Sequence, residues 1–166
     1  MVVAFVDECK SGTFALGITL VHLRDLKLVR SELRKLRKPG QNRLHFSKES
    51  ESRRKEILST MRILPIHVFV IESALKHEGQ AREACLKELV NACPSLNVHR
   101  IVLEEDQSLV KRDKAVIRSQ LRVLGETHNL DYFHESPNFE PCLWISDAIA
   151  WANHKGGYWL ALAGLV

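Results

Sequence analysis

The feature that most constrains the fold is the opening apolar run, Val2 to Val6, which ends in two adjacent carboxylates, Asp7 and Glu8. A short unbroken apolar run bounded by charge predicts a strand that is buried on both faces. Successive side chains on a strand point to opposite faces, so Asp7 and Glu8 project to different sides. A carboxylate at the end of a buried strand is poorly hydrated unless a cation lies beside it. Asp7 therefore either begins a turn or belongs to a functional site.

The rest of the chain alternates predicted strands and helices. A second strand, at 13–21, would form a hairpin with the first, and Gly17 within it indicates a bulge or a close backbone approach. Ser47 or Ser50 is expected to cap the second of the helices. The expected helices are 25–38, 50–64, 78–92, 109–124 and 141–154, and the later strands are 66–71, 98–103 and 130–133. This order predicts one α/β domain over residues 1–166, with a mixed five-stranded sheet flanked by helices and a helical insertion after the first hairpin.

Composition and charge narrow the class of protein. No apolar run approaches the roughly 18 residues of a membrane span, and the N-terminus does not resemble a signal peptide. The cysteines are scattered without a Cys-x-x-Cys pair, which favours reduced thiols in a cytoplasmic protein over a zinc site or disulfides. Their positions are Cys9, Cys85, Cys93 and Cys142.

The net charge of +4 is unevenly distributed. Between His22 and Glu56, twelve lysines and arginines stand against five acidic residues, so the remainder of the chain is acidic. The basic side chains of the two predicted helices in this segment either form an ordinary solvated face or contact phosphate groups. The candidates for nucleic-acid contact are Lys27, Arg30, Arg34, Arg37, Lys38, Arg53 and Arg54.

The last predicted helix carries one charged residue in an otherwise apolar stretch. Asp147 falls among Leu143, Trp144, Ala150 and Trp151 on a helix that is apolar almost all the way round, which predicts burial. A buried ionised carboxylate costs several kcal/mol unless it is paired or binds a metal. Asp147 is thus either a structural residue, hydrogen-bonded to Ser146 or to a buried arginine, or a ligand.

Further acids follow the strand predicted at 98–103. Glu104, Glu105 and Asp106 end it as Asp7 and Glu8 end the first strand, and ligands of open α/β sheets bind beyond the carboxyl ends of strands. Asp113, one turn into the next helix, is either a first-turn acid favoured by the helix dipole or a secondary candidate for the site. Asp106 is the other secondary candidate.

Asp7, Asp147 and one acid of the Glu104–Asp106 run are expected to converge. Three carboxylates in one place repel each other unless some are protonated or a divalent cation binds, and all-oxygen ligands suit Mg²⁺ or Mn²⁺. Two such ions about 4 Å apart activate water and stabilise the leaving oxygen in phosphodiester cleavage. The basic segment would supply the surface for the phosphate backbone.

The order of these elements and acids resembles the ribonuclease H-like superfamily. More closely, the chain resembles a bacterial family of unknown function within it, through Val6-Asp7-Glu8, Leu44-His45-Phe46-Ser47-Lys48 and Leu143-Trp144-Ile145-Ser146-Asp147-Ala148. Relatives place Ser-Gly after the opening acids, where this chain has Cys9-Lys10. The resemblance implies that Asp7, Glu104 and Asp147 bind metal, that Glu8 supports them, and that His45 and Lys48 position phosphate or water.

Two functions follow as expectations. The first is a Mg²⁺- or Mn²⁺-dependent nuclease or phosphodiesterase acting on RNA or DNA. The second is a non-catalytic module on the same fold that binds nucleic acid or an acidic protein. The sequence contains no Gly-x-x-x-x-Gly-Lys-Ser/Thr, Gly-x-Gly-x-x-Gly or Gly-x-Ser-x-Gly motif, which disfavours nucleotide-dependent and serine-hydrolase chemistry. Trp159 and the apolar end 160–166 are expected either to cover the sheet or to form a homodimer contact.

Overall fold

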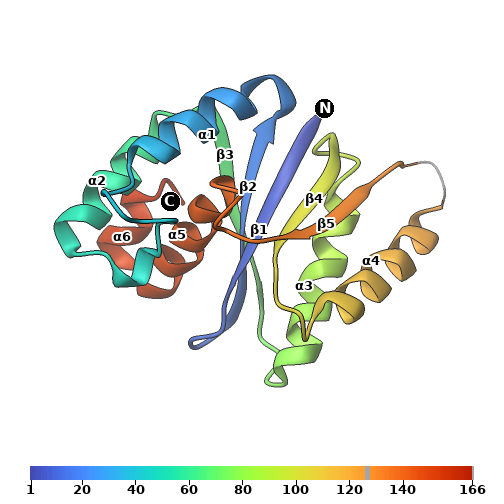
Figure 1. Cartoon of the computed structure of the whole chain (residues 1–166). Helices are drawn as coiled ribbons and strands as arrows, with labels where there is room; N and C mark the ends of the chain where they lie inside the picture. The colour runs from blue at the N-terminus through green and yellow to red at the C-terminus, as the bar shows by residue number, and fades with distance from the viewer. Residues whose placement is uncertain (126–127, 166) are drawn as a thin grey trace.

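Five strands form one mixed sheet in the computed structural model, which describes residues 1–125 and 128–165. The strands lie in the order β3-β2-β1-β4-β5, with β1 antiparallel to β2 and parallel to β4. The β2–β3 pair is antiparallel and the β4–β5 pair is parallel (Figure 1). Their bounds are β1 Val2–Cys9, β2 Phe14–His22, β3 Ile66–Ser73, β4 Val98–Glu104 and β5 Asp131–Glu135.

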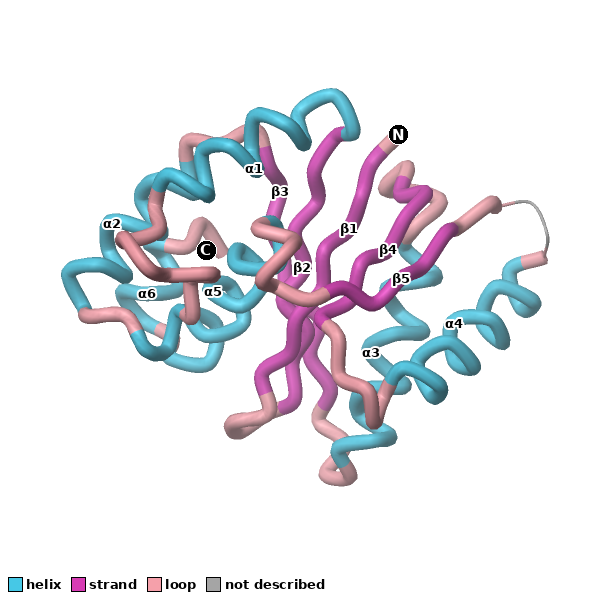
Figure 2. The backbone as a smooth tube through the Cα atoms, viewed as in Figure 1, coloured by secondary structure: helices cyan, strands magenta, loops and turns pink. Residues whose placement is uncertain are grey.

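Helices cover both faces of the sheet (Figure 2). On one face lie α3 (Glu78–Ala92) and α4 (Val110–Leu124). On the other lie α1 (Leu26–Lys35), α2 (Glu51–Arg62), α5 (Cys142–Lys155) and α6 (Gly157–Leu162). Short 3-10 turns, η1 (Leu23–Asp25) and η2 (Phe46–Lys48), connect elements on this second face. The mixed sheet and the helical insertion between β2 and β3 confirm the predicted architecture.

Strand β1 is central and buried on both faces, as its unbroken apolar sequence predicts. Its side chains alternate between two separate cores. Val3 and Phe5 pack beneath α5, whereas Ala4 and Val6 pack beneath α3. The same alternation sends Asp7 to the α5 face and Glu8 to the α3 face. The two acids therefore enter different environments at the end of one strand.

Helix α5 packs very closely on β2 at Gly17. A Cβ atom at this position would lie 2.4 Å from the backbone oxygen of Ser146 and 2.9 Å from the nitrogen of Ala150, so only glycine fits. The buried Ser146 hydroxyl donates to the Phe5 carbonyl at 2.9 Å and lies 2.9 Å from the Thr19 hydroxyl. The pairing of β1 with β2 continues without a register shift through Gly17, so there is no bulge at this position. Of the two predicted roles of Gly17, the close backbone approach is the one found.

Several element boundaries differ from the expectation. Helix α1 ends at Lys35 and Leu36 is its C-cap, so the helix stops before the predicted Lys38 and ahead of Pro39-Gly40. Leu23, just before this helix, lies in η1 with 48% of its surface exposed. Ser50, and not Ser47, caps α2 by accepting a hydrogen bond from the Arg53 backbone N–H at 3.2 Å.

The C-terminal segment packs against the α5 face. Helix α6 was not predicted, and its Trp159 and Leu162, together with Leu165, contact the core beneath α5 while Ala163 is buried. This packing shows that the segment covers the core, whereas the homodimer contact stays a prediction. Within residues 1–125 and 128–165, none of the helices has the length and apolar character required to span a membrane.

Candidate active site

The first acid of the site, Asp7, lies near the end of β1 on the α5 face. Its Oδ1 accepts a hydrogen bond from the backbone N–H of Glu8 at 2.7 Å. Strand β4 runs parallel to β1 and pairs Leu103 with Val6, so the next residue, Glu104, emerges beside Asp7. The Glu104 carboxyl is within hydrogen-bonding reach of the Asp7 carboxyl. Two strand ends therefore bring two acids together.

The third acid, Asp147, comes from α5. The close contact at Gly17 holds this part of the helix against the β1–β2 hairpin, and Asp147 is half-buried beside it. Its Oδ2 accepts the backbone N–H of Phe46 at 3.0 Å, which attaches the η2 turn to the helix. Asp147 is therefore hydrogen-bonded, as the structural interpretation expected, but to the backbone of Phe46 instead of to Ser146.

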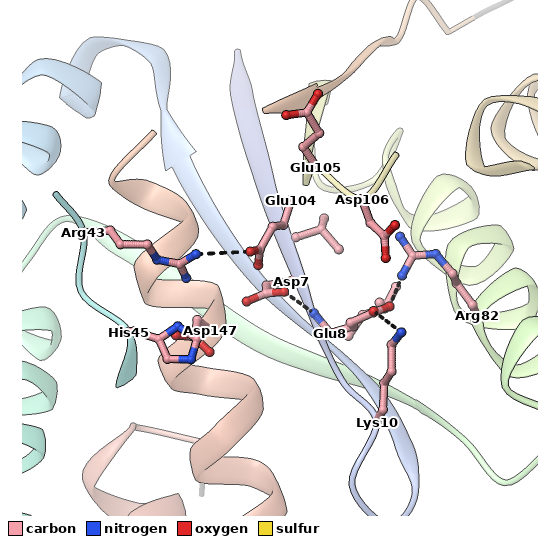
Figure 3. A pocket seen from close by; sticks show the side chains of 12 residues that line it. Asp7, Glu8, Lys10, Arg43, His45, Arg82, Glu104, Glu105, Asp106 and Asp147 are labelled. Atoms are coloured by element: carbon pink, nitrogen blue, oxygen red, sulfur yellow. Dashed lines mark hydrogen bonds and ion pairs between the residues drawn. The ribbon is translucent and has the colours of Figure 1, made fainter. Parts of the chain in front are cut away.

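These three acids line one cavity of about 490 Å³ at the carboxyl ends of β1 and β4. Figure 3 shows Asp7, Glu104, Asp147 and His45 gathered on one side of β1, with Glu8, Lys10 and Arg82 on the other. The cavity is lined by Val6, Asp7, Glu8, Lys10, Leu16, Arg43, His45, Arg82, Glu104, Glu105, Asp106 and Asp147. Acidic and basic side chains thus line the same cavity.

The environment of these carboxyl groups disfavours their charge. Burial, the hydrogen bond with Glu104 and the negative charges of Glu104 and Asp147 raise the pKa of Asp7 well above its ordinary value. Burial also raises the pKa of Asp147, although the Phe46 N–H and the positive charges of His45 and Arg43 oppose this. Such shifts arise when like charges are forced together away from water, and they are common at functional sites.

The donor chemistry of the site suits a hard divalent cation. Three carboxyl groups offer oxygen ligands, which Mg²⁺ and Mn²⁺ prefer. Among the residues that the structure describes, however, no three His, Cys, Asp or Glu side chains stand in a ready-made ligand arrangement. The Glu104 carboxyl faces both Asp7 and the Arg43 guanidinium, whose Nη1 lies 3.4 Å from Oε1. The three carboxyl groups fit such a cation in donor chemistry.

Glu8 belongs to a separate ionic network on the α3 face. It pairs with Arg82 and with Lys10, whose Nζ lies 3.0 Å from Oε1. Arg82 is buried and also binds Asp113 with two hydrogen bonds of 2.7 and 2.8 Å. His134 Nε2 lies 2.8 Å from the same Asp113 carboxylate. This network fixes the Glu8 carboxylate at the cavity wall.

The secondary candidates lie outside the acid cluster. Asp113 is 1% exposed and is committed to Arg82 and His134, so it is a structural ion-pair residue of α4. Asp106 lies at the rim, where its Oδ1 accepts from the Ser108 backbone N–H and hydroxyl, and these bonds lower its pKa. Glu105 is exposed, and Figure 3 shows its carboxyl directed away from Asp7.

The two residues expected to position phosphate or water are placed differently. His45 lines the cavity beside Asp147. Lys48 ends the η2 turn, is exposed, and is not among the residues that line the cavity.

The basic residues predicted to contact nucleic acid divide into those that bind other parts of the protein and those that are exposed. Arg30 forms a double hydrogen bond with the buried Glu140, and Arg53 pairs with the buried Glu49, because each buried acid requires a cation. Arg37 lies over the Trp144 ring, with its guanidinium carbon 5.8 Å from the ring centroid. Arg54 donates to the carbonyls of the η2 turn. The exposed members of the set are Lys27, Arg34 and Lys38.

Sequence reasoning missed three cations of the cavity: Lys10, Arg43 and Arg82. The burial of Arg82 could have been predicted, because it lies between the inward-facing Ala81 and Cys85 of α3. Asp147 likewise lies among buried residues of α5. The positions of Lys10 and Arg43 could not be predicted, because turn and loop residues have no periodicity from which the direction of a side chain could be inferred.

Comparisons with known proteins support the fold. No family model matches the sequence, and no curated protein matches it. Among solved structures, the chain is similar to one described as the PCNA:RNase HII complex from Archaeoglobus fulgidus, with a TM-score of 0.63 and 17% identity. The match covers 93% of this chain and 73% of the other. The fold is therefore ribonuclease H-like, and the resemblance to the bacterial family stays an expectation.

Proposed function

We propose that this protein is a divalent-metal-dependent nuclease or phosphodiesterase that acts on nucleic acid. One observation carries the proposal: Asp7, Glu104 and Asp147, from three distant segments, line one cavity together with Arg43 and His45. The raised pKa values of Asp7 and Asp147 indicate a site with excess negative charge and little water. The ribonuclease H-like fold agrees with such an activity but does not by itself imply it.

In this proposal Asp7, Glu104 and Asp147 hold one or two Mg²⁺ or Mn²⁺ ions. When bound, the cation would supply an activated water nucleophile and positive charge at the phosphate. The Phe46 N–H orients the Asp147 carboxylate, and the Glu8 N–H orients that of Asp7. Of the three acids that follow β4, Glu104 is assigned as the ligand because it alone lies against Asp7.

The cations around the acids have a complementary role. Arg43, once released from Glu104, can donate two parallel hydrogen bonds to a phosphate group. His45 lies beside Asp147 in the cavity and can hold or deliver a proton near the scissile bond. Glu8 is a supporting acid whose charge is balanced by Arg82 and Lys10. We further propose a cytoplasmic setting, because the four cysteines are free thiols.

The test is cleavage of labelled RNA, DNA and RNA–DNA hybrid substrates with Mg²⁺ or Mn²⁺. Asp7→Asn should reduce cleavage about 100-fold or more, since the loss of a metal ligand removes several kcal/mol of transition-state stabilisation. Glu88→Gln, which removes the same charge from an exposed position on α3 outside the cavity, is the matched control and should retain activity. Equal activity of Asp7→Asn and the unaltered protein would overturn the assignment.

A non-catalytic binding module is the second candidate. It is favoured by the pairing of Glu104 with Arg43 and Asp7, which leaves no ready-made ligand set among the described residues. Such a module would bind nucleic acid with a steep salt dependence, without a metal requirement and without cleavage of any substrate.

A further inference from the structure

A row of four aromatic side chains leads from the candidate active site to the surface. The ring centroids of Phe46 and Trp151 are 5.1 Å apart, those of Trp151 and Trp159 are 5.1 Å apart, and those of Trp159 and Tyr158 are 5.5 Å apart. Phe46 is buried and its backbone binds Asp147, whereas Tyr158 is 59% exposed. We call these residues the aromatic row.

Cationic side chains flank the aromatic row. The guanidinium carbon of Arg54 lies 4.6 Å from the centroid of the Trp151 ring, and Lys155 Nζ lies 5.6 Å from the same ring. Lys55 Nζ lies 5.6 Å from the Tyr158 ring. Lys55 also pairs with Glu51 at 2.9 Å, but both side chains are exposed, and such a pair exchanges readily for a phosphate.

The aromatic row lies next to the acid cavity, beside its acid Asp147. Trp151 is four residues after Asp147 on α5, one helical turn further along the same side, and Phe46 contacts both of them. Helices α2, α5 and α6, which carry the rest of the row and its cations, lie together in Figure 1. Beyond the cavity along α5, a bound polymer would therefore meet the exposed Tyr158 ring and the cations Lys55 and Lys155.

We infer that the exposed end of the aromatic row, with Lys55 and Lys155, binds an unpaired stretch of the nucleic acid whose phosphate enters the cavity. The inference rests on the proposed function. Stacking of bases on aromatic rings beside backbone-contacting cations is how proteins bind single strands, since only unpaired bases offer their faces. The exposed Tyr158 ring and the half-buried Trp159 indole supply the stacking surfaces, and Lys55 and Lys155 supply the phosphate contacts.

The test measures binding apart from cleavage. Fluorescence anisotropy with a labelled 12-nucleotide single strand, in chelator-containing buffer, gives a dissociation constant that needs no catalysis. Tyr158→Ala should weaken binding about 5- to 150-fold, the range for loss of one stacked base. Tyr158→Phe, which keeps the ring, should bind like the unaltered protein. A duplex of the same sequence should bind more weakly and respond little to Tyr158→Ala.

The charge contribution is tested by a matched pair of lysines. Lys55 and Lys87 are both exposed and both pair with a glutamate one helical turn earlier, but Lys87 lies on α3, across the sheet. Lys55→Gln should reduce the slope of log affinity against log salt by about 0.7, the value for one single-strand phosphate contact. Lys87→Gln should leave the slope unchanged.

The outcomes separate this inference from the proposed function. Unchanged single-strand affinity in Tyr158→Ala, or equal loss with single strand and duplex, would overturn the aromatic row as a single-strand site even if the enzyme cleaves. Loss of binding in Tyr158→Ala, with no cleavage of any substrate by the unaltered protein, would support the row and refute the nuclease.

Discussion

Gly17 lies directly opposite Asp7 across the antiparallel ladder of β1 and β2. Because Gly17 has no side chain, the backbone of α5 approaches the hairpin at this point, with the Ser146 oxygen where a Cβ would be. The residue after Ser146 is Asp147, so the glycine that pairs with one acid also admits the helix that carries another. The convergence of distant carboxylates therefore depends on a missing side chain.

The first prediction concerns this contact. Gly17→Ala should destabilise the protein by about 1–3 kcal/mol, the usual cost of forcing an extra group into a packed core. The 2.4 Å approach to a backbone oxygen leaves no flexible atom to move aside. Urea unfolding measures the change, and a drop in metal-dependent cleavage of the folded fraction should accompany it.

The control for Gly17→Ala is Gly79→Ala. Gly79 lies in α3, and the three atoms nearest to a Cβ there would all belong to the guanidinium of Arg112, an exposed and flexible side chain. Alanine is favoured over glycine in a helix by about 1 kcal/mol, so this variant should be neutral or more stable. Equal stability of the two variants would show that the approach of α5 is not tight at Gly17.

The second prediction concerns the buried charge of Asp7. In chelator-containing buffer at pH 7, Asp7→Asn should raise Tm, by about 2–4 °C for each kcal/mol of repulsion removed. Burial and the neighbouring Glu104 raise the pKa of Asp7, so the folded state disfavours its ionised form. Asp106→Asn, at an exposed acid whose hydrogen bonds to Ser108 lower its pKa, should give no such rise. A lower Tm in Asp7→Asn would contradict this account of the cluster.

The third prediction concerns the pH dependence of the Arg82–Asp113 pair. Burial alone would raise the pKa of Asp113, but hydrogen bonds from Arg82 and His134 outweigh it, and the pKa lies below its ordinary value of 3.8. A carboxylate with a lowered pKa in the folded state stabilises the protein above pH 3.8, and this contribution is lost as pH falls through the folded pKa. Asp113→Asn should therefore cost about 3 kcal/mol at pH 7, where it breaks a buried pair, and much less near pH 2.

Urea midpoints from pH 2 to pH 7 test this prediction. Asp131→Asn is the matched control, because Asp131 pairs with Arg100 at 3.8 Å on the surface, and an exposed pair contributes about 0–1 kcal/mol. The prediction fails if the stability difference for Asp113→Asn is as large at pH 2 as at pH 7.

Much of the fold was predictable because periodicity and burial agree along the chain. The apolar run of β1, the spacing of α3 and the position of Gly17 each indicated the structure found. The α6 helix was missed because six residues behind two glycines give too short a pattern. The sequence also could not show which basic residues of α1 and α2 pair with distant acids such as Glu140.

The candidate site was predictable where a charge interrupts an apolar element. Asp7 and Asp147 are such interruptions, and both line the cavity. Asp113 gave the same signal but is explained by Arg82, a partner on another helix. Pattern alone identifies a buried charge, and only the three-dimensional arrangement shows whether a cation of the protein already balances it.

The most direct test of the central claim is a crystal structure of the protein grown with Mn²⁺, with anomalous density used to locate the ion. The account predicts a peak in the cavity, bonded to carboxylate oxygens of Asp7 and Asp147, with Glu104 turned from Arg43 toward it. Density without such a peak at saturating Mn²⁺, with Glu104 still paired with Arg43, would contradict it.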